Sequence, residues 1–132
     1  MEETKRRRMT AREKNKLFNM FDGCCAYCGT KLKNMGAMQA DRKVPLALGE
    51  ADTMENLFPA CKSCNHYKRT FDVEGFRKYL SGIPRRLMCS NTAFNAAVRY
   101  GLVKLTGDEV TFYFETVEKR REKQDDSKKE TV

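Results

Sequence analysis

The chain contains no apolar run approaching about 18 residues, the length that spans a membrane, and it shows no signal peptide and no internal repeat. These absences argue against a membrane protein, a secreted protein and a repeat array. We therefore expect a protein of the reducing cytoplasm, where four of its six cysteines indicate metal ligands rather than disulfides. Histidine is nearly missing as well, since His66 is the only one in the chain.

Length and charge limit the possibilities further. A chain of 132 residues, 40% of them hydrophobic, suits one domain with a small core that a metal would help to hold together. We expect a basic tail over residues 1–9, a single domain over residues 10–117 and a charged, disordered tail over residues 118–132. The net charge of +8 indicates a polyanionic partner such as nucleic acid, although an ordinary basic protein has the same balance.

Two Cys-x-x-Cys pairs are the strongest signal in the sequence, because four thiolates form the closed tetrahedral set that structural zinc prefers. The four cysteines are Cys25, Cys28, Cys61 and Cys64. The pairs are separated by 32 residues, more than the about 15–20 of a simple zinc ribbon, so a further element is inserted between them. The remaining Cys24 and Cys89 are expected to be packed or surface thiols, although Cys24 is near enough in sequence to compete for the metal.

The residues around these pairs resemble the His-Asn-His (HNH) nucleases, in particular small phage-type and homing members. The family pattern is an Asp-His-hydrophobic-x-Pro strand, a Gly-Gly-x-Asp loop, and an Asn-Leu-x-Pro-x-Cys-x-x-Cys-Asn/His-x-x-Lys ending. The residues that fall in register are Asp41, Pro45, Gly49, Asp52, Asn56, Leu57, Pro59, Cys61, Cys64, Asn65 and Lys68. Two positions depart from the pattern, since Arg42 stands where the family has its general-base histidine and Glu50 replaces the second glycine.

The resemblance implies a fold, cofactors and site residues. The fold would be α+β, a small zinc-stapled ββα-metal domain with flanking helices. A catalytic Mg²⁺ or Mn²⁺ would be held by Asp41 on the strand and Asn65 at the start of the final helix. Asn56 would hold the loop through backbone hydrogen bonds, and Lys68 would contact a DNA phosphate. Taken singly, Asp41 and Asn65 also suit ordinary roles as a hydrogen-bond acceptor and a helix cap.

Arg42 raises a question about activity, because a guanidinium cannot give up its proton near neutral pH as a general base must. Three answers are open. The metal ion can activate water without a protein base while Arg42 holds the phosphate, or His66 can supply the base, or the nuclease is inactive. On a helix, the side chain of His66 points about 100° away from that of its neighbour Asn65, which makes it the weaker alternative.

Local patterns predict the remaining elements. A capping box formed by Thr10 and Glu13 predicts a helix over residues 11–22, and Asp52 is expected to cap a later helical turn. At the C-terminal end, two segments flank the turn residues 106–108, and Val110, Phe112 and Phe114 alternate in the second of them, which predicts a β-hairpin. The expected ranges are 38–44 for a strand, 53–56, 65–70, 72–81 and 90–100 for helices, and 102–105 with 109–115 for the hairpin.

Three functions fit the sequence. The first is a metal-dependent endonuclease that cuts or nicks double-stranded DNA, as the resemblance implies. The second is a binding protein on a retired nuclease frame, for instance an anti-CRISPR inhibitor of a host defence nucleoprotein complex, located in the host cytoplasm if it is phage-encoded. The third is a plain zinc-ribbon module that binds nucleic acid. Phosphate contacts are expected from residues 5–16, which carry a net charge of +6, and from Lys68, Arg69, Arg85 and Arg86.

Overall fold

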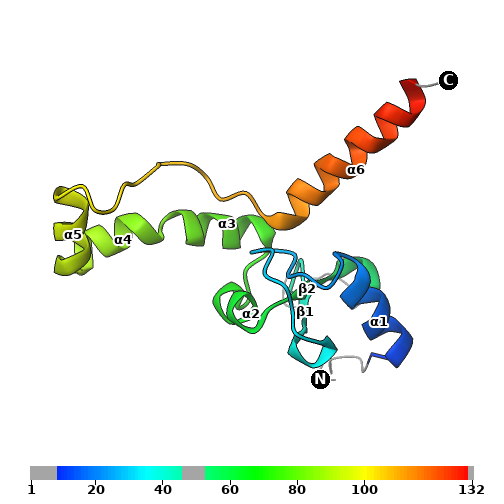
Figure 1. Cartoon of the computed structure of the whole chain (residues 1–132). Helices are drawn as coiled ribbons and strands as arrows, with labels where there is room; N and C mark the ends of the chain where they lie inside the picture. The colour runs from blue at the N-terminus through cyan, green and yellow to red at the C-terminus, as the bar shows by residue number, and fades with distance from the viewer. Residues whose placement is uncertain (1–8, 46–52, 131–132) are drawn as a thin grey trace. The chain divides into compact units, whose positions relative to one another are not determined.

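The computed structural model describes residues 9–45 and 53–130, the last five of these by their backbone alone. The chain divides into two compact units, whereas the sequence predicts a single domain over residues 10–117. The first unit consists of Met1–Asp72 with Thr111–Val132, and the second unit is Val73–Val110. Figure 1 shows the elements of both units in chain order. Residues 1–8 of the basic tail predicted over residues 1–9, and the predicted cap at Asp52, lie outside the described residues.

Helix α1 (Ala11–Asn19) begins with the capping box that the sequence predicts. The Glu13 amide donates a hydrogen bond to the Thr10 hydroxyl at 3.1 Å, and the Thr10 amide donates one to the Glu13 carboxylate at 3.0 Å. The helix ends three residues before the predicted end at residue 22. It ends early because the chain turns through positive φ at both Asp22 and Gly23.

Strands β1 (Gln39–Arg42) and β2 (Leu57–Ala60) form a two-stranded antiparallel sheet. The pairs in register are Gln39 with Ala60, Ala40 with Pro59, Asp41 with Phe58, and Arg42 with Leu57. A short 3₁₀ helix precedes each strand, η1 (Met35–Ala37) before β1 and η3 (Met54–Asn56) before β2. The helical turn predicted over residues 53–56 is therefore present as η3.

Helix α2 (Lys62–Lys68) begins three residues before the helix predicted over residues 65–70. The reason is Cys61, whose thiol accepts a hydrogen bond from the Cys64 amide at 3.4 Å and so caps the first turn. Asn65 consequently lies within α2 rather than at its start. Helix α1 packs against β2 and α2 packs against β1, so the sheet lies between two helices (Figure 1). The predicted α+β fold with a ββα arrangement is confirmed.

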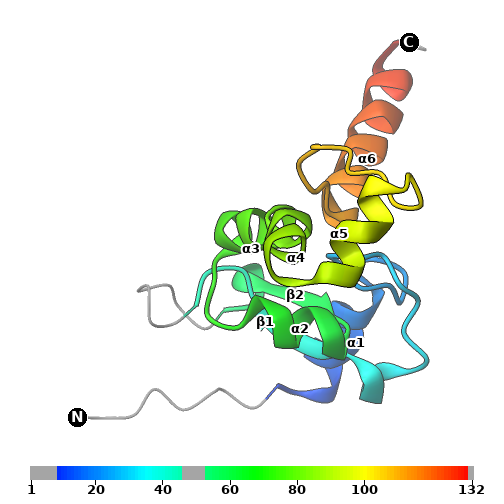
Figure 2. The ribbon, with the colours of Figure 1, turned by 90° about the vertical axis from the view of Figure 1, so that its left-hand side faces the viewer.

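The second unit carries helices α3 (Val73–Ser81), α4 (Ile83–Ser90) and α5 (Thr92–Arg99). Of these, α3 and α5 confirm the helices predicted over residues 72–81 and 90–100. The sequence does not predict α4, because Gly82 followed closely by Pro84 indicates a turn. Pro84 instead lies in the first turn of α4, where its missing N–H leaves no helical bond unmade. Figures 1 and 2 show α3 and α4 following nearly one line, with α5 crossing the end of α4.

Helix α6 (Tyr113–Glu130) overturns two predictions at the C-terminal end. No strand lies over residues 102–115, all of them described, so the predicted β-hairpin is wrong. The tail predicted to be disordered over residues 118–132 is helical throughout its described part. The Phe112 amide donates a hydrogen bond to the Glu115 carboxylate at 2.9 Å, which forms half of a capping box at the helix start. The Glu, Lys and Arg residues that follow are strong helix formers.

Aromatic rings form much of the core of the first unit. The ring centroid of Tyr27 lies 5.8 Å from that of Phe58 and 5.2 Å from that of Phe112. Phe114 lies 4.7 Å from Phe58, and its amide donates a hydrogen bond to the Ala26 carbonyl at 2.7 Å. Phe112 and Phe114, whose alternation predicts a strand, therefore do pack into the core, but they lie at the N-terminal end of α6.

Candidate functional site

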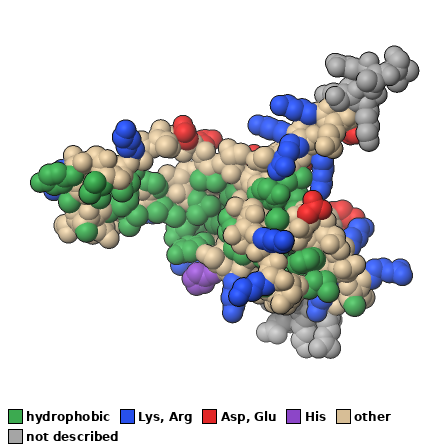
Figure 3. Space-filling model, viewed as in Figure 1, with side chains coloured by type: hydrophobic (Ala, Val, Ile, Leu, Met, Phe, Trp, Pro, Cys, Tyr) green, Lys and Arg blue, Asp and Glu red, His purple; other side chains and the backbone are tan. Residues whose placement is uncertain are grey.

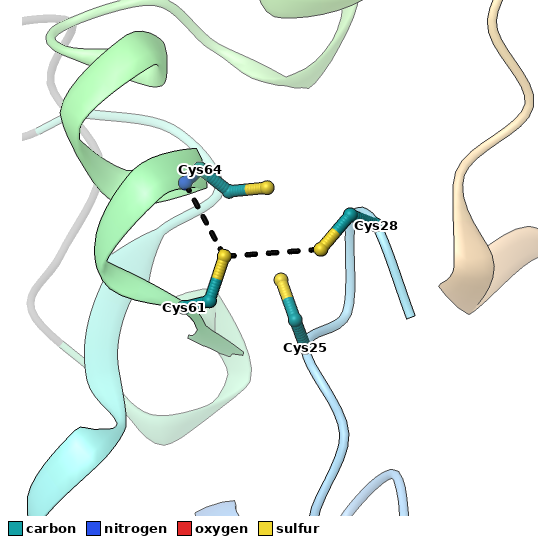
Figure 4. Close-up of side chains that lie close together, drawn as sticks. All are labelled: Cys25, Cys28, Cys61 and Cys64. Atoms are coloured by element: carbon teal, nitrogen blue, oxygen red, sulfur yellow. Dashed lines mark hydrogen bonds between the residues drawn. The ribbon is translucent and has the colours of Figure 1, made fainter. Parts of the chain in front are cut away.

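Four cysteine thiols converge at one point of the first unit (Figure 4). They are the four that the sequence predicts, Cys25, Cys28, Cys61 and Cys64. Their sulfur atoms all lie within 4.8 Å of one another, and the sulfurs of Cys28 and Cys61 are 3.8 Å apart. Zinc–sulfur bonds of about 2.3 Å in a tetrahedron also place the sulfurs about 3.8 Å apart, so the spacing suits zinc.

The first cysteine pair occupies a tight turn whose backbone is fixed. The Gly29 amide donates a hydrogen bond to the Cys25 carbonyl at 3.0 Å. Gly29 has a φ of +79°, and a Cβ there would lie 2.9 Å from the Tyr113 ring, so a larger residue would be strained. The Ala26 amide donates to the Pro59 carbonyl at 2.8 Å, which joins this turn to β2.

The thiols influence one another's ionisation. The hydrogen bond with Cys64 lowers the pKa of Cys25 to about 4, although burial acts in the opposite direction. The pKa of Cys64 is raised in turn, chiefly by this hydrogen bond and then by burial. The arrangement favours a thiolate at Cys25, and the thiolate is the form that binds metal. Cys24 and Cys89 lie outside the cluster.

The cluster suits a structural ion rather than a catalytic one. Four protein thiolates complete the tetrahedral shell of zinc and leave no position for water or substrate. Two of the donors come from the turn after α1, and two come from the beginning of α2. A zinc ion held there would therefore join this turn to α2, and it would contribute directly to the stability of the fold.

A buried carboxylate, that of Asp41, joins three parts of the first unit. The ammonium of Lys68, at the end of α2, lies 3.0 Å from Asp41 Oδ2 and also donates a hydrogen bond to the Arg42 carbonyl. The Tyr27 hydroxyl donates to the same Oδ2 at 2.5 Å. The side chains of Lys68 and Asp41 are only 1% and 5% exposed. Burial and the charge of Asp41 raise the pKa of Tyr27, so this hydroxyl stays protonated and remains a donor.

The other predicted site residues occupy different environments. Asn56 is buried, and its side-chain amide donates to the Val44 carbonyl at 2.8 Å and accepts from the Val44 amide at 3.0 Å. It thus holds the loop after β1 through backbone hydrogen bonds. Arg42, at the end of β1, and Asn65, within α2, are half-buried, whereas His66 is exposed.

The segment that carries the cysteine cluster matches a known protein family. Residues 25–71 match the HNH endonuclease family. This segment is an HNH domain. It contains both cysteine pairs, the β1–β2 sheet and α2, whereas α1, the helices of the second unit and α6 lie outside the match. No curated protein and no solved structure matches the chain. None of the described helices is long and apolar enough to cross a membrane.

Lys68 is buried in this HNH domain, whereas the sequence predicts that it contacts a DNA phosphate. A contact with a DNA phosphate requires an accessible ammonium, but the Lys68 ammonium is buried against Asp41 and the Arg42 carbonyl. Burial explains the difference, since a charge removed from water needs a counter-charge and hydrogen-bond partners inside the protein. In this arrangement Lys68 acts as a structural cation.

Tyr27 is the residue of this HNH domain that the sequence does not reveal. An aromatic residue inside a Cys-x-x-Cys pair is expected to pack against the fold, and Tyr27 does so. Nothing in the spacing shows that its hydroxyl also reaches Asp41, which lies 14 residues further along the chain. Only the folding of the first cysteine turn onto the β1–β2 sheet brings the two side chains together.

Proposed function

We propose that this chain is an HNH-type endonuclease that hydrolyses phosphodiester bonds in DNA with the help of Mg²⁺ or Mn²⁺. The observation that carries this proposal is that the HNH match over residues 25–71 coincides with a four-cysteine cluster on a ββα frame. The net charge of +8 also favours a polyanionic substrate. Zinc at the cysteines serves the fold in this proposal, and the chemistry takes place on the β1–α2 side of the frame.

Asp41 and Asn65 are the residues that we assign to the divalent ion. Carboxylate and amide oxygens are ligands that Mg²⁺ and Mn²⁺ accept, and the two residues come from β1 and α2, which are in contact. A divalent ion bound there would stabilise the negative charge that develops on the phosphate during cleavage. The Asp41 carboxylate is already paired with Lys68, so ion binding requires this carboxylate to serve two cations or Lys68 to withdraw.

Arg42 and His66 are the candidates for contact with the substrate. We assign Arg42 to phosphate binding, because a planar guanidinium can pair with a phosphate through two parallel hydrogen bonds. His66 is exposed on α2 and is the only imidazole available as a proton acceptor, although its side chain points about 100° away from that of Asn65. Asn56 and Lys68 support the site by holding the loop and α2 in place.

A second function is favoured by the same geometry, namely an HNH-fold protein that binds nucleic acid without cutting it. Arg42 cannot accept a proton at neutral pH, and the loss of a general base commonly lowers the rate by about 10²–10⁴. In addition, Lys68 already neutralises the one carboxylate that we assign to the divalent ion. Both features would lower the rate of cleavage, but neither removes the net positive charge that favours binding to nucleic acid.

Nicking of supercoiled plasmid distinguishes the two functions. We expect zinc-loaded protein to produce open circles with Mg²⁺ or Mn²⁺ and to produce none when both are omitted. Asp41→Asn retains an acceptor for Tyr27 but removes the charge, so it should abolish nicking. Glu55→Gln changes an exposed carboxylate of the same domain and should leave nicking unchanged. Retained DNA binding without nicking under any of these conditions would reject the endonuclease in favour of the second function.

A further inference from the structure

The outer face of α2 combines exposed rings with exposed cations. Tyr67 is 46% exposed, and Lys62, His66 and Arg69 are exposed as well. His66, the only histidine of the chain and purple in Figure 3, stands at the surface. The opposite face of α2 is held by the cysteine cluster and by the buried Lys68, so the orientation of the helix is fixed.

Helical spacing explains how these side chains come to lie together. Lys62 begins α2 and His66 follows four residues later on the same face of the helix, whereas Arg69 is the cap residue directly after the helix end. Tyr67 lies about 100° around the axis from His66. The two rings pack edge to face with their centroids 5.6 Å apart, and Tyr67 keeps its exposure despite this contact.

The exposed charged residues of this segment are of one sign. Residues 61–71 contain no carboxylate, and of their three cations Lys62 and Arg69 are exposed, whereas Lys68 is buried against Asp41. Neither Lys62 nor Arg69 forms an ion pair with any residue that the structure describes. The exposed ring offers a stacking partner to another flat ring, and the exposed cations of the same segment offer positive charge to an anion. A nucleotide carries both groups, since its base is a flat ring and its phosphate is an anion.

We propose that the outer face of α2 binds unpaired nucleotides, with a base stacked on Tyr67 and the flanking phosphates held by Lys62 and Arg69. Bases inside a duplex are already stacked on their neighbours and cannot receive the ring, so the site requires a single-stranded segment. This inference rests on the proposed function and extends it, because Tyr67 lies on α2, the helix that also carries Asn65. The DNA that the HNH site receives would then be single-stranded, or branched with an unpaired strand on α2.

Tryptophan fluorescence offers a direct test of stacking, because the chain contains no tryptophan. Tyr67→Trp places a single reporter on α2, and Tyr100→Trp places one at a site of the second unit that is 80% exposed. Titration with oligo(dT), without added divalent ion, should quench the Tyr67→Trp emission and leave the Tyr100→Trp emission nearly unchanged. Binding seen by anisotropy of labelled oligo(dT) without quenching of the Tyr67→Trp emission would overturn the proposal.

The affinity for oligo(dT) of variants that carry no tryptophan reporter tests the same site. Stacking of one base on an aromatic ring corresponds to about 5- to 140-fold in affinity, so Tyr67→Ala should weaken oligo(dT) binding within that range. Tyr67→Phe keeps the ring and should stay within about twofold of wild type. A blunt-ended duplex should bind Tyr67→Ala and wild type equally well. Loss of duplex binding to the same extent, or equal losses in Tyr67→Ala and Tyr67→Phe, would overturn the proposal.

The charge contribution and the nuclease proposal can be separated in the same experiments. Lys62→Gln and Arg69→Gln should each reduce the slope of log affinity against log salt by about 0.7 on single strands, whereas Tyr67→Ala should leave the slope unchanged. Binding is measured without Mg²⁺ or Mn²⁺, so it does not depend on cleavage. If oligo(dT) stacks on Tyr67 while neither plasmid nor single-stranded circular DNA is cut with Mg²⁺ or Mn²⁺, the nuclease proposal fails and this one stands. If plasmid is nicked but Tyr67→Ala binds oligo(dT) as wild type does, this proposal fails and the nuclease proposal stands.

Discussion

The ammonium of Lys68 lies 3.0 Å from Oδ2 of Asp41, and both side chains are almost completely buried. The pair links the end of α2 to β1, and the Tyr27 hydroxyl links the first cysteine turn to the same oxygen. The zinc cysteines join this turn to the beginning of α2. The HNH domain therefore has two connections between the same parts, one through the cysteines and one through a buried carboxylate.

Removal of Lys68 should be costly for this reason. Lys68→Met keeps the length and most of the volume of the side chain, but it leaves the Asp41 carboxylate buried without its counter-charge. Breaking a buried ion pair on one side typically costs about 3–5 kcal/mol. Urea unfolding of the zinc-loaded protein should show a loss of this size, whereas Lys62→Met, at an exposed position of the same helix, should change stability by less than about 0.5 kcal/mol.

The double variant Asp41→Asn with Lys68→Met separates the ion pair from the packing of Lys68. Its unfolding free energy should exceed that expected from the sum of the single losses, with a coupling of about 0.5–3 kcal/mol. Strict additivity of the two losses would mean that Lys68 stabilises α2 through its hydrocarbon stem alone.

Zinc removal should unfold the first unit. We expect about one tightly held zinc per chain, since the four thiols form one closed site. Cys61→Ser should lose this zinc, and helical circular dichroism should fall with it; since Ser is itself a preferred helix cap, this fall reports the loss of zinc and not of the cap at the start of α2. Cys89→Ser is the matched control, because Cys89 is exposed and lies outside the cluster. A well-folded protein that contains no zinc would contradict this account.

The parts of the structure that could be predicted from the sequence are those encoded at short, fixed spacing. The capping box depends on two residues three positions apart, and each cysteine pair depends on two residues in one turn. The start of α2 could not be placed correctly because Cys61 acts as a helix cap, a role usually taken by Ser, Thr, Asp or Asn. Local patterns therefore predict the fold class and the metal cluster, whereas they do not predict a helix boundary that depends on a thiol.

The features that could not be predicted depend on interactions between distant segments. The pairing of Asp41 with Lys68 requires β1 and α2 to pack together, and nothing in the spacing distinguishes this Lys from one that faces solvent. The alternation of Phe112 and Phe114 is equally compatible with a strand until the Phe114 amide bonds to Ala26. That bond, with the cap from Glu115, favours the helix over the strand.

Phe112 should be the main anchor of α6. It is 1% exposed, and its ring centroid lies 5.2 Å from that of Tyr27. Phe112→Ala should therefore cost about 3–5 kcal/mol in unfolding free energy, the usual range for a buried aromatic ring. Tyr100→Ala, at a ring that is 80% exposed in the second unit, should change stability by less than about 0.5 kcal/mol. If Phe112→Ala is as mild as Tyr100→Ala, then α6 does not depend on this ring.

Duplex DNA binding should depend on the cations of α1. Arg12, Lys14 and Lys16 are exposed, and they belong to the basic segment over residues 5–16 that the sequence singles out. Replacing all three by Gln should weaken binding to unrelated duplexes equally, because phosphate contacts carry no base information. The slope of log affinity against log salt should fall by about 0.9 for each phosphate that the variant no longer neutralises. An unchanged slope would mean that these side chains do not bind phosphates.

The proton acceptor is the part of catalysis that Arg42 cannot supply. If Asp41 and Asn65 place a divalent ion, Arg42→His restores a base and should raise Mg²⁺- or Mn²⁺-dependent nicking by about 10²–10⁴. Initial rates on supercoiled plasmid measure this change, and zinc content and circular dichroism establish that the variant is folded. Arg42→Lys keeps the charge without providing a base at neutral pH, so it serves as the matched control and should not be faster than wild type.

The Arg42→His experiment has three possible outcomes, and each supports a different account of the site. An increase that Asp41→Asn abolishes in the double variant would mean that the wild-type site lacks only its base. A wild type that is already fast and is slowed by both Arg42→His and Arg42→Lys would make Arg42 a phosphate-binding catalytic residue, because neither substitute reproduces the paired hydrogen bonds of a guanidinium. If wild type and Arg42→His are both inactive, although both are folded and contain zinc, the base is not the missing part. The buried pairing of Asp41 with Lys68 then becomes the reason, and the binding function takes the place of the nuclease.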